Sequence, residues 1–384
     1  MSNTNAYKTG SRWLLATDAL ESLFNALISL GYTVIGPTVR DSAIDYAPLK
    51  SIDALPRGWT EVQDAATYQI KKRDDNAYFG FSNGPGSWKK FLRPEEERLW
   101  RAKRSGDAFA IELGDVAETG QLAFFGVRAC DLAAIAILDT VVGENQEYKT
   151  RRNGLFIVAI NCSSAGGTCF CVSMKTGPQA TSGFDLALTE VLNGDRHDFI
   201  IEVGSRKGAD VIAALPVRPA NASDLSLVES IIRGTAEQMG RTLDTNGLAS
   251  AIGANLDHSH WDDVAERCLT CGNCTMVCPT CYCTTMEDRT DLDGDHTERW
   301  RVWDSCFSLD FTYAAGGSIR TSSRSRYRQW LSHKLSTWVD QFGTLGCVGC
   351  GRCVTWCPVG IDITKEAKAI TSTEQPEVNH AQET

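Results

Sequence analysis

The sequence has neither an excess of positive charge nor a long hydrophobic run. Among its 384 residues, 48 aspartates and glutamates outnumber 38 lysines and arginines, which gives a formal net charge of −10. An acidic chain of this kind disfavours nucleic acid or an anionic membrane surface as its main partner. No apolar run reaches the roughly 18 residues that indicate a membrane-spanning helix. We therefore expect no nucleic-acid partner and no membrane span.

Several short motifs of common activities are also missing. The opening residues, MSNTNAYKTG, have no charged segment followed by an apolar one, so we expect no secretory signal and a cytoplasmic location. No G-x-G-x-x-G sequence follows a predicted strand, and no P-loop lysine motif occurs. We therefore expect the chain itself to bind neither flavin nor nicotinamide. No nucleophile–base pair and no terminal C-x2-C pair for nickel can be assigned, so we predict no catalytic residue.

Cysteine, by contrast, is abundant, with fifteen residues. Without a secretory signal, metal ligation explains them better than disulfide bonds, and most of them lie in tight groups with short spacings. Two runs share the spacing C-x2-C-x2-C-x3-C-P: CLTCGNCTMVCP at 268–279 and CVGCGRCVTWCP at 347–358. This internal repeat is the strongest functional signal in the sequence.

The repeated spacing is a bacterial-type [4Fe–4S] signature, in which the fourth cysteine of each run ligates the other cluster. Three cysteines at every third residue can surround a cubic cluster, and Gly272 and Gly351 let the backbone approach it. We predict two [4Fe–4S] clusters, the first ligated by Cys268, Cys271, Cys274 and Cys357, and the second by Cys347, Cys350, Cys353 and Cys278. The alternative is two four-cysteine zinc sites, although zinc more often uses C-x2-C pairs separated by a longer loop.

Four further cysteines suggest a third cluster. Cys130 and Cys162 each follow a predicted strand, and Cys169 and Cys171 lie a few residues later in a glycine-containing loop. If the two strands are parallel neighbours, these thiols meet at the carboxyl edge of the sheet, where open α/β sheets bind ligands. The alternative is four buried free cysteines.

The last three cysteines are Cys281 and Cys283, in CPTCYC, and Cys306, in WDSC. Because a fourth ligand is missing from this group, packing near a cluster is favoured over an additional metal site. A basic stretch follows them at 319–334, with four arginines, one lysine and no acidic residue. It could attract an acidic partner or flank a cluster and raise its potential, and a solvated helix face explains it equally well.

The order of elements along the chain indicates two structural parts. Apolar runs at 120–130, 154–162 and 197–204 are predicted strands, and 131–142 and 184–192 are predicted helices. This alternation favours a mostly parallel sheet covered by helices. We predict an α+β or α/β domain over residues 1–220, an α-helical ferredoxin-like dicluster domain over 221–370, and a disordered polar tail over 371–384.

The combination GVRACD, INC…CFC, CLTCGNCTMVCPTCYC, WDSC and CVGCGRCVTWCP resembles the beta (iron–sulfur) subunit of cytoplasmic NAD(P)-linked nickel–iron hydrogenases, or sulfhydrogenases. It is equally similar to the electron-transfer subunit of anaerobic sulfite reductases. The resemblance spans roughly residues 75–365. In the hydrogenase case it implies a complex with the hydrogenase large and small subunits and with an FAD/NAD(P)-binding flavoprotein subunit.

These observations predict an electron-transfer subunit that is not itself catalytic. The leading hypothesis is a relay of single electrons between a nickel–iron hydrogenase module and the flavoprotein, in reversible hydrogen oxidation coupled to NAD(P). The second hypothesis is the corresponding subunit of an anaerobic sulfite reductase. A third is a structural module whose clusters only stabilise the fold.

Overall fold

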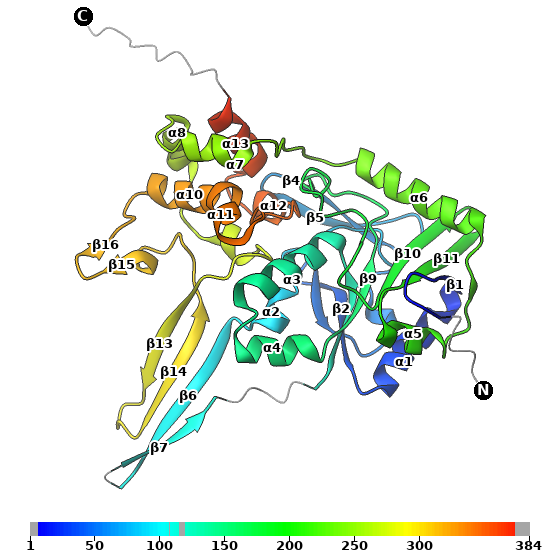
Figure 1. Cartoon of the computed structure of the whole chain (residues 1–384), viewed down its shortest axis with the longest axis horizontal. Helices are drawn as coiled ribbons and strands as arrows, with labels where there is room; N and C mark the ends of the chain where they lie inside the picture. Colours follow the sequence, from blue (N-terminus) through cyan, green and yellow to red (C-terminus); the bar gives the residue numbers. More distant parts are fainter. Residues whose placement is uncertain (1–6, 107, 115–119, 373–384) are drawn as a thin grey trace, which may run out of the picture.

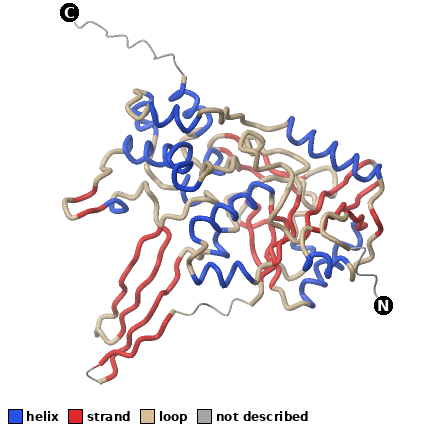
Figure 2. The backbone as a smooth tube through the Cα atoms, in the orientation of Figure 1, coloured by secondary structure: helices blue, strands red, loops and turns tan. Residues whose placement is uncertain are grey.

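The computed structural model describes residues 7–106, 108–114 and 120–372, and its centre is a mixed eight-stranded sheet (Figures 1 and 2). Its strands are β1 (Arg12–Ala16), β2 (Thr33–Arg40), β3 (Ala43–Pro48), β8 (Leu122–Val127), β9 (Phe156–Ile160), β10 (Leu186–Asn193), β11 (Arg196–Val203) and β12 (Arg218–Pro219). They follow the order β12-β1-β11-β10-β9-β8-β2-β3. The middle strands β10, β9, β8 and β2 are parallel, and the outer pairs are antiparallel. The expected α/β architecture of this half is confirmed in outline.

Helices cover both faces of this sheet. One face carries α1 (Leu20–Ser29) and α5 (Arg206–Ile212), and the other carries α3 (Ala129–Val142), α4 (Gln146–Asn153) and α6 (Ala222–Glu237). All five residues of β9, FIVAI, are buried, because helices remove both of its faces from water. The sheet therefore holds the carboxyl ends of β8 and β9 rigidly side by side.

One local prediction is wrong. The sequence predicts a helix at 184–192, whereas β10 occupies Leu186–Asn193. Its first six residues are all buried, and a short continuous apolar run cannot be assigned to helix or strand from periodicity alone. Eight cross-strand pairs with β11 and a turn at Gly194, with φ of 60°, decide the outcome.

A second sheet of four strands projects from the body as an arm (Figures 1 and 2). It consists of β6 (Glu96–Ser105), β7 (Ala108–Leu113), β13 (Thr284–Thr290) and β14 (His296–Trp303), in the order β13-β14-β6-β7. β13 and β14 lie between the two cysteine runs, joined by a turn that contains an Asp-Gly pair. The segment 221–370 is therefore not wholly helical, and its hairpin shares a sheet with strands from before residue 220.

Helices nevertheless surround the two cysteine runs. They are α7 (Leu248–Ala254), α8 (His260–Arg267), α9 (Asn273–Met276), α10 (Ser323–Ser332), the π-helical turn η4 (His333–Thr337), α11 (Trp338–Phe342), α12 (Arg352–Thr355) and α13 (Ile363–Thr371). Trp261, Leu331 and Leu335 form their common core, and partly buried cysteines of both runs pack against it.

Small elements complete the described chain. They are η1 (Thr17–Ala19), η2 (Ile52–Ala54), η3 (Asp310–Thr312), α2 (Lys89–Leu92), β15 (Tyr313–Ala314), β16 (Gly317–Ser318), and the hairpin of β4 (Trp59–Asp64) with β5 (Thr67–Lys72). That hairpin contacts the second cysteine run, since the rings of Tyr68 and Trp356 are 5.0 Å apart. The predicted disordered tail lies outside the described residues from position 373 onward. Within the described ranges, no helix combines the length and apolar character needed to cross a membrane.

Candidate iron–sulfur centres

The first candidate centre is a hollow at the end of α8. It is lined by the four cysteines that the sequence assigns to the first cluster, Cys268, Cys271, Cys274 and Cys357, together with Phe307, Tyr327 and Trp330. Gly272 precedes α9 with φ of 76°, which turns the chain around the hollow. The structure thus brings Cys357 from the second run to the first, as the cross-over rule expects. Ligation by these residues stays a prediction.

Backbone amides already point at this set. The Thr270 N–H donates to Cys268 Sγ at 3.4 Å, and the Ile361 N–H donates to Cys357 Sγ at 3.3 Å. Burial raises the pKa of Cys274, and the neighbouring thiols Cys268 and Cys357 raise it further. Thiols crowded in this way lose their protons readily only if a cation replaces them, which suits an iron cluster.

The second candidate centre gathers Cys347, Cys350 and Cys353 with Cys278 of the first run. Burial raises the pKa of Cys353, followed by the charges of Cys347, Cys350 and Cys278. The Gly349 N–H donates to Cys347 Sγ at 3.5 Å. Cys278 of the other run lies near this set, as the cross-over rule expects, and ligation by these four residues stays a prediction. The first and second sets adjoin, because Cys353 of the second also lines the hollow of the first.

A third group of thiols forms where the sheet meets the second run. β8 and β9 are parallel neighbours, so Cys130, in the first turn of α3, and Cys162, just after β9, lie at one edge of the sheet. Burial raises the pKa of Cys171, and the neighbouring Cys162 and Cys169 raise it further. Burial also raises the pKa of Cys130, with smaller contributions from Asp131 and Cys171. All four cysteines proposed for a third cluster are therefore brought together.

This third group adjoins the second. Cys350 acts on the pKa values of Cys130, Cys169 and Cys171, and Cys169 Sγ lies 4.0 Å from the Cys350 carbonyl oxygen. Cys130, Cys171 and Cys350 also share one apolar cluster with Trp338. The three groups of thiols consequently form a continuous series, first to second to third.

The glycines of the second run are required by this packing. Gly349 and Gly351 have φ of 67° and 77°. A Cβ on Gly349 would lie 2.6 Å from the Phe170 oxygen, and one on Gly351 would lie 2.4 Å from the Thr168 oxygen. The sequence predicts that Gly351 leaves room for a cluster. In the structure it leaves room for the loop that carries Cys169.

A buried guanidinium beside the third group of cysteines favours negative charge at that site. Arg128 is 2% exposed, and its Nη2 donates to the carbonyl oxygens of Phe79 and Phe81 at 3.0 and 2.5 Å. Its Nη1 finds no oxygen acceptor. Burial raises the pKa of the nearby Cys162 thiol, and the charge of Arg128 and a hydrogen bond from it lower that pKa in part. Thiolates or an iron–sulfur cluster at this position would supply the missing negative charge.

Single-ion sites are not favoured by the same geometry. Across the residues that the structure describes, no group of three or more histidine, cysteine, aspartate or glutamate side chains is spaced to hold one metal ion. The thiolates of a cubic cluster bind different irons, so they stand further apart than the ligands of one zinc ion.

Two comparisons with known proteins agree with this arrangement. A family model described as a 4Fe-4S dicluster domain matches residues 267–361. Over 360 residues, the chain is 31% identical to Sulfhydrogenase 2 subunit beta of Pyrococcus furiosus, and the match covers 91% of this chain and 96% of that protein. The chain belongs to the sulfhydrogenase beta-subunit family. As a member of that family, it is an iron–sulfur electron-transfer protein with [4Fe–4S] clusters in its dicluster domain.

Cys281, Cys283 and Cys306 lie close to the first two sets in this family member. The Cys281 thiol donates a hydrogen bond that lowers the pKa of Cys278, and the Cys306 thiol lowers that of Cys283 to about 7 in the same way. Lys89 is nearby, with its Nζ 3.0 Å from the Cys281 oxygen and 3.7 Å from the centre of the Trp303 ring. The packing role expected for these three cysteines stays a prediction.

Sequence reasoning missed the buried cations. Arg128 and Lys89 carry no recognisable signal, because their importance depends on thiols far away in the sequence. Lys334 is the last residue of the basic stretch 319–334, whose cations have two different environments in the structure. Arg324 and Arg328 form ion pairs with the surface carboxylates Asp262 and Asp257, whereas Lys334 enters the core.

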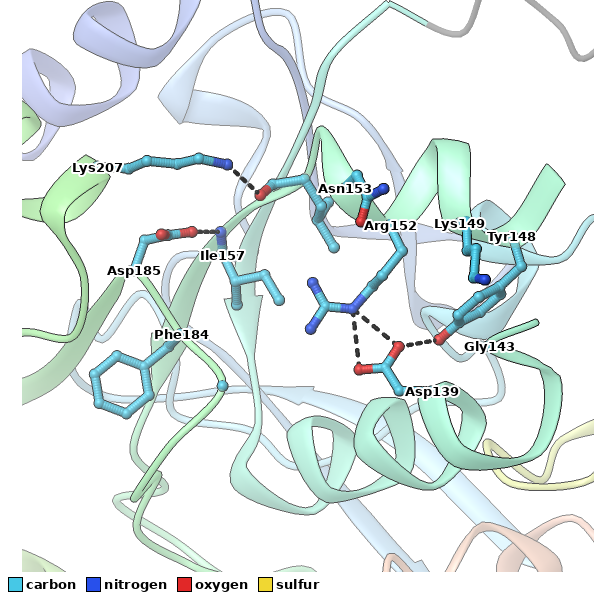
Figure 3. Close-up of a pocket in the computed structure, with 12 residues that line it drawn as sticks. Asp139, Gly143, Tyr148, Lys149, Arg152, Asn153, Ile157, Phe184, Asp185 and Lys207 are labelled. Atoms are coloured by element: carbon cyan, nitrogen blue, oxygen red, sulfur yellow. Dashed lines mark hydrogen bonds and ion pairs between the residues drawn. The ribbon is translucent and has the colours of Figure 1, made fainter. Parts of the chain in front are cut away.

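A pocket of about 530 Å³ lies beside α3 and α4, and none of its lining residues is a cysteine (Figure 3). Asp139 accepts hydrogen bonds from Tyr148 at 2.7 Å and from Arg152 Nε at 3.1 Å. Asp185 accepts from the Ile157 N–H at 2.8 Å, and Lys207 reaches the Leu155 oxygen at 3.5 Å. These polar groups are engaged with one another, so we assign the pocket no chemistry.

Proposed function

We propose that this chain relays single electrons through [4Fe–4S] clusters between a nickel–iron hydrogenase module and an FAD/NAD(P)-binding flavoprotein subunit. The proposal extends the family membership to specific partners and to hydrogen oxidation coupled to NAD(P). The observation that carries it is the continuous series of three cysteine sets. Cys353 of the second set lines the hollow of the first, and Cys350 of the second set packs against Cys130 and Cys171 of the third.

The series reaches the surface at its first set. Cys271 is exposed, and the adjacent Leu269 is 61% exposed. In the third set, Cys130, Cys169 and Cys171 are buried, and Cys162 is half-buried. An exposed thiol and an exposed leucine beside a redox centre are what an electron-transfer contact with a partner subunit needs. The first set is therefore our proposed contact with one of the two partners.

The chain's own residues would hold and shield the electrons. When bound, an iron–sulfur cluster accepts and releases one electron at a time. Backbone N–H groups of Thr270, Gly349 and Ile361 donate to cysteine sulfurs and stabilise negative charge there. Phe307, Tyr327 and Trp330 exclude water from the first set. A hydride carrier handles two electrons together, so a flavin on a partner is needed to pair them.

The proposal is tested by tagging the chain in its native host and identifying what co-purifies without oxygen. The expected partners are the large and small subunits of a nickel–iron hydrogenase with a flavoprotein, and the complex should reduce NAD(P) with hydrogen. Cys350→Ser should abolish that reduction while the subunits still assemble. Retained reduction in the variant contradicts the relay. A sirohaem protein in place of the nickel–iron one would move the chain to sulfite reduction.

A further inference from the structure

Lys334 is a buried lysine whose three donors are all used. It lies in the π-helical turn η4 and is 3% exposed. Its Nζ is 3.1 Å from Cys278 Sγ, 2.9 Å from Thr280 Oγ1 and 3.2 Å from the Gly346 oxygen. An ammonium group has three N–H donors and no acceptor, so this environment matches the charged form.

The positive charge has no carboxylate partner. No aspartate or glutamate of the described ranges forms an ion pair with Lys334, whose hydrogen bonds go to the sulfur and the two oxygens above. A buried charge without compensation costs several kcal/mol. The charges that act on Lys334 are those of the thiols Cys278, Cys281 and Cys347. Two of these belong to the second cysteine set, so compensation comes from that set.

The helix is distorted at this lysine. α10 and α11 are joined by the π-helical turn His333–Thr337, and π-turns of this kind occur frequently at functional sites. Leu331 and Leu335, on either side of Lys334 in the chain, are fully buried in the core around the clusters. The extra residue of the π-turn thus lets a lysine enter a region that otherwise holds apolar side chains.

We propose that Lys334 is a positioning residue that acts through Cys278 and raises the reduction potential of the second cluster. Reduction adds one negative charge to the cluster, and a fixed positive charge 3.1 Å from a ligating sulfur stabilises the reduced form. A hydrogen bond to that sulfur acts in the same direction. This inference rests on the cluster assignment proposed above.

The test compares Lys334→Met, Lys334→Gln and Lys334→Arg with the unaltered full chain, all purified without oxygen. Iron content is measured first, and midpoint potentials are then obtained by redox titration followed by electron paramagnetic resonance. Lys368→Met is the matched control, because Lys368 is an exposed lysine on α13 in the same domain. It removes the same charge from a solvated position.

We expect both neutral variants to lower the equilibrium constant for reduction of one cluster about tenfold. For a one-electron couple this lowers the midpoint potential of that cluster by about 59 mV. Lys334→Arg should restore most of the shift, and Lys368→Met should cause none. Equal potentials in Lys334→Gln and Lys368→Met, at full iron content, overturn the inference. Loss of the cluster's iron in both neutral variants also overturns it, because Lys334 would then hold the site together. If the unaltered chain lacks [4Fe–4S] signals, it is the proposed function that fails.

Discussion

The Nη1 atom of Arg352 lies 2.9 Å from the Oδ1 atom of Asp131, and their side chains are 0% and 1% exposed. Arg352 stands between Cys350 and Cys353 of the second cysteine set, and Asp131 follows Cys130 of the third. The pair therefore fixes the two sets relative to each other, with one residue contributed by each half of the chain.

Removing one member of this pair should be costly. Arg352→Met leaves Asp131 buried and uncompensated, and we expect it to lower the free energy of unfolding by about 3–5 kcal/mol. Denaturant unfolding of the full chain without oxygen, followed by circular dichroism, measures the loss. The double variant Arg352→Met with Asp131→Leu should be more stable than Arg352→Met alone, because no charge is then stranded. Strictly additive losses would contradict the pairing.

The third set should bind its own iron. We expect Cys169→Ser to remove roughly four irons per chain, while the other two clusters keep their spectroscopic signals. Iron analysis and electron paramagnetic resonance of the anaerobic chain measure both quantities. Cys306→Ser is the matched control, because that cysteine is assigned to packing and its replacement should leave the iron content unchanged. An unaltered iron count in Cys169→Ser would reduce the third set to buried free thiols.

Gly351 and Gly272 occupy equivalent places in the two runs, and we expect replacement by alanine to be more damaging at Gly351. A Cβ at Gly351 would lie 2.4 Å from a backbone oxygen, whereas at Gly272 the nearest atom is the Ser305 Oγ, at 3.1 Å. Both have positive φ, so backbone strain is common to the two and cancels in the comparison. We expect Gly351→Ala to lower the thermal midpoint and the iron content more than Gly272→Ala. The reverse order would show that packing between the halves is not what Gly351 provides.

Asp224 provides a prediction about pH. Burial raises its pKa, but hydrogen bonds from Arg218, the Asn221 N–H and Arg196 outweigh burial and bring the pKa from 3.8 to about 2. A carboxyl with a depressed pKa stabilises the fold above about pH 4, and that contribution is lost as the pH falls towards 2. Asp224 also closes the capping box at the start of α6. We expect Asp224→Asn to weaken that cap and to lower the free energy of unfolding by about 1–2 kcal/mol.

That cost should be the same between about pH 6 and pH 8, since the pKa lies far below this window. Urea unfolding of the full chain at several pH values gives the comparison, and the exposed Glu229 of the same helix, replaced by Gln, is the control. A cost that grows or vanishes within the window would mean that another group titrates with Asp224.

The cysteine sets were predictable because their information is local or follows from one topological rule. The spacing of the two runs indicates eight thiols, and the expected parallel neighbours place Cys130 beside Cys162. The buried cations could not be predicted in this way. Lys334 meets Cys278 across 56 residues, and nothing in either local sequence records that contact. The helix expected at 184–192 failed for a related reason, because pairing with β11 decided its structure.

The four-stranded arm joins β6, from before residue 220, to β14, from between the two cysteine runs. The segment that matches the dicluster domain, residues 267–361, therefore has no self-contained boundary. Cutting it out would leave β14 paired with β13 alone, without β6, and would leave Gly349 and Gly351 without the loop against which they pack. Fusing this segment to a foreign redox enzyme would therefore require the whole chain, because residues outside 267–361 support the cysteine runs.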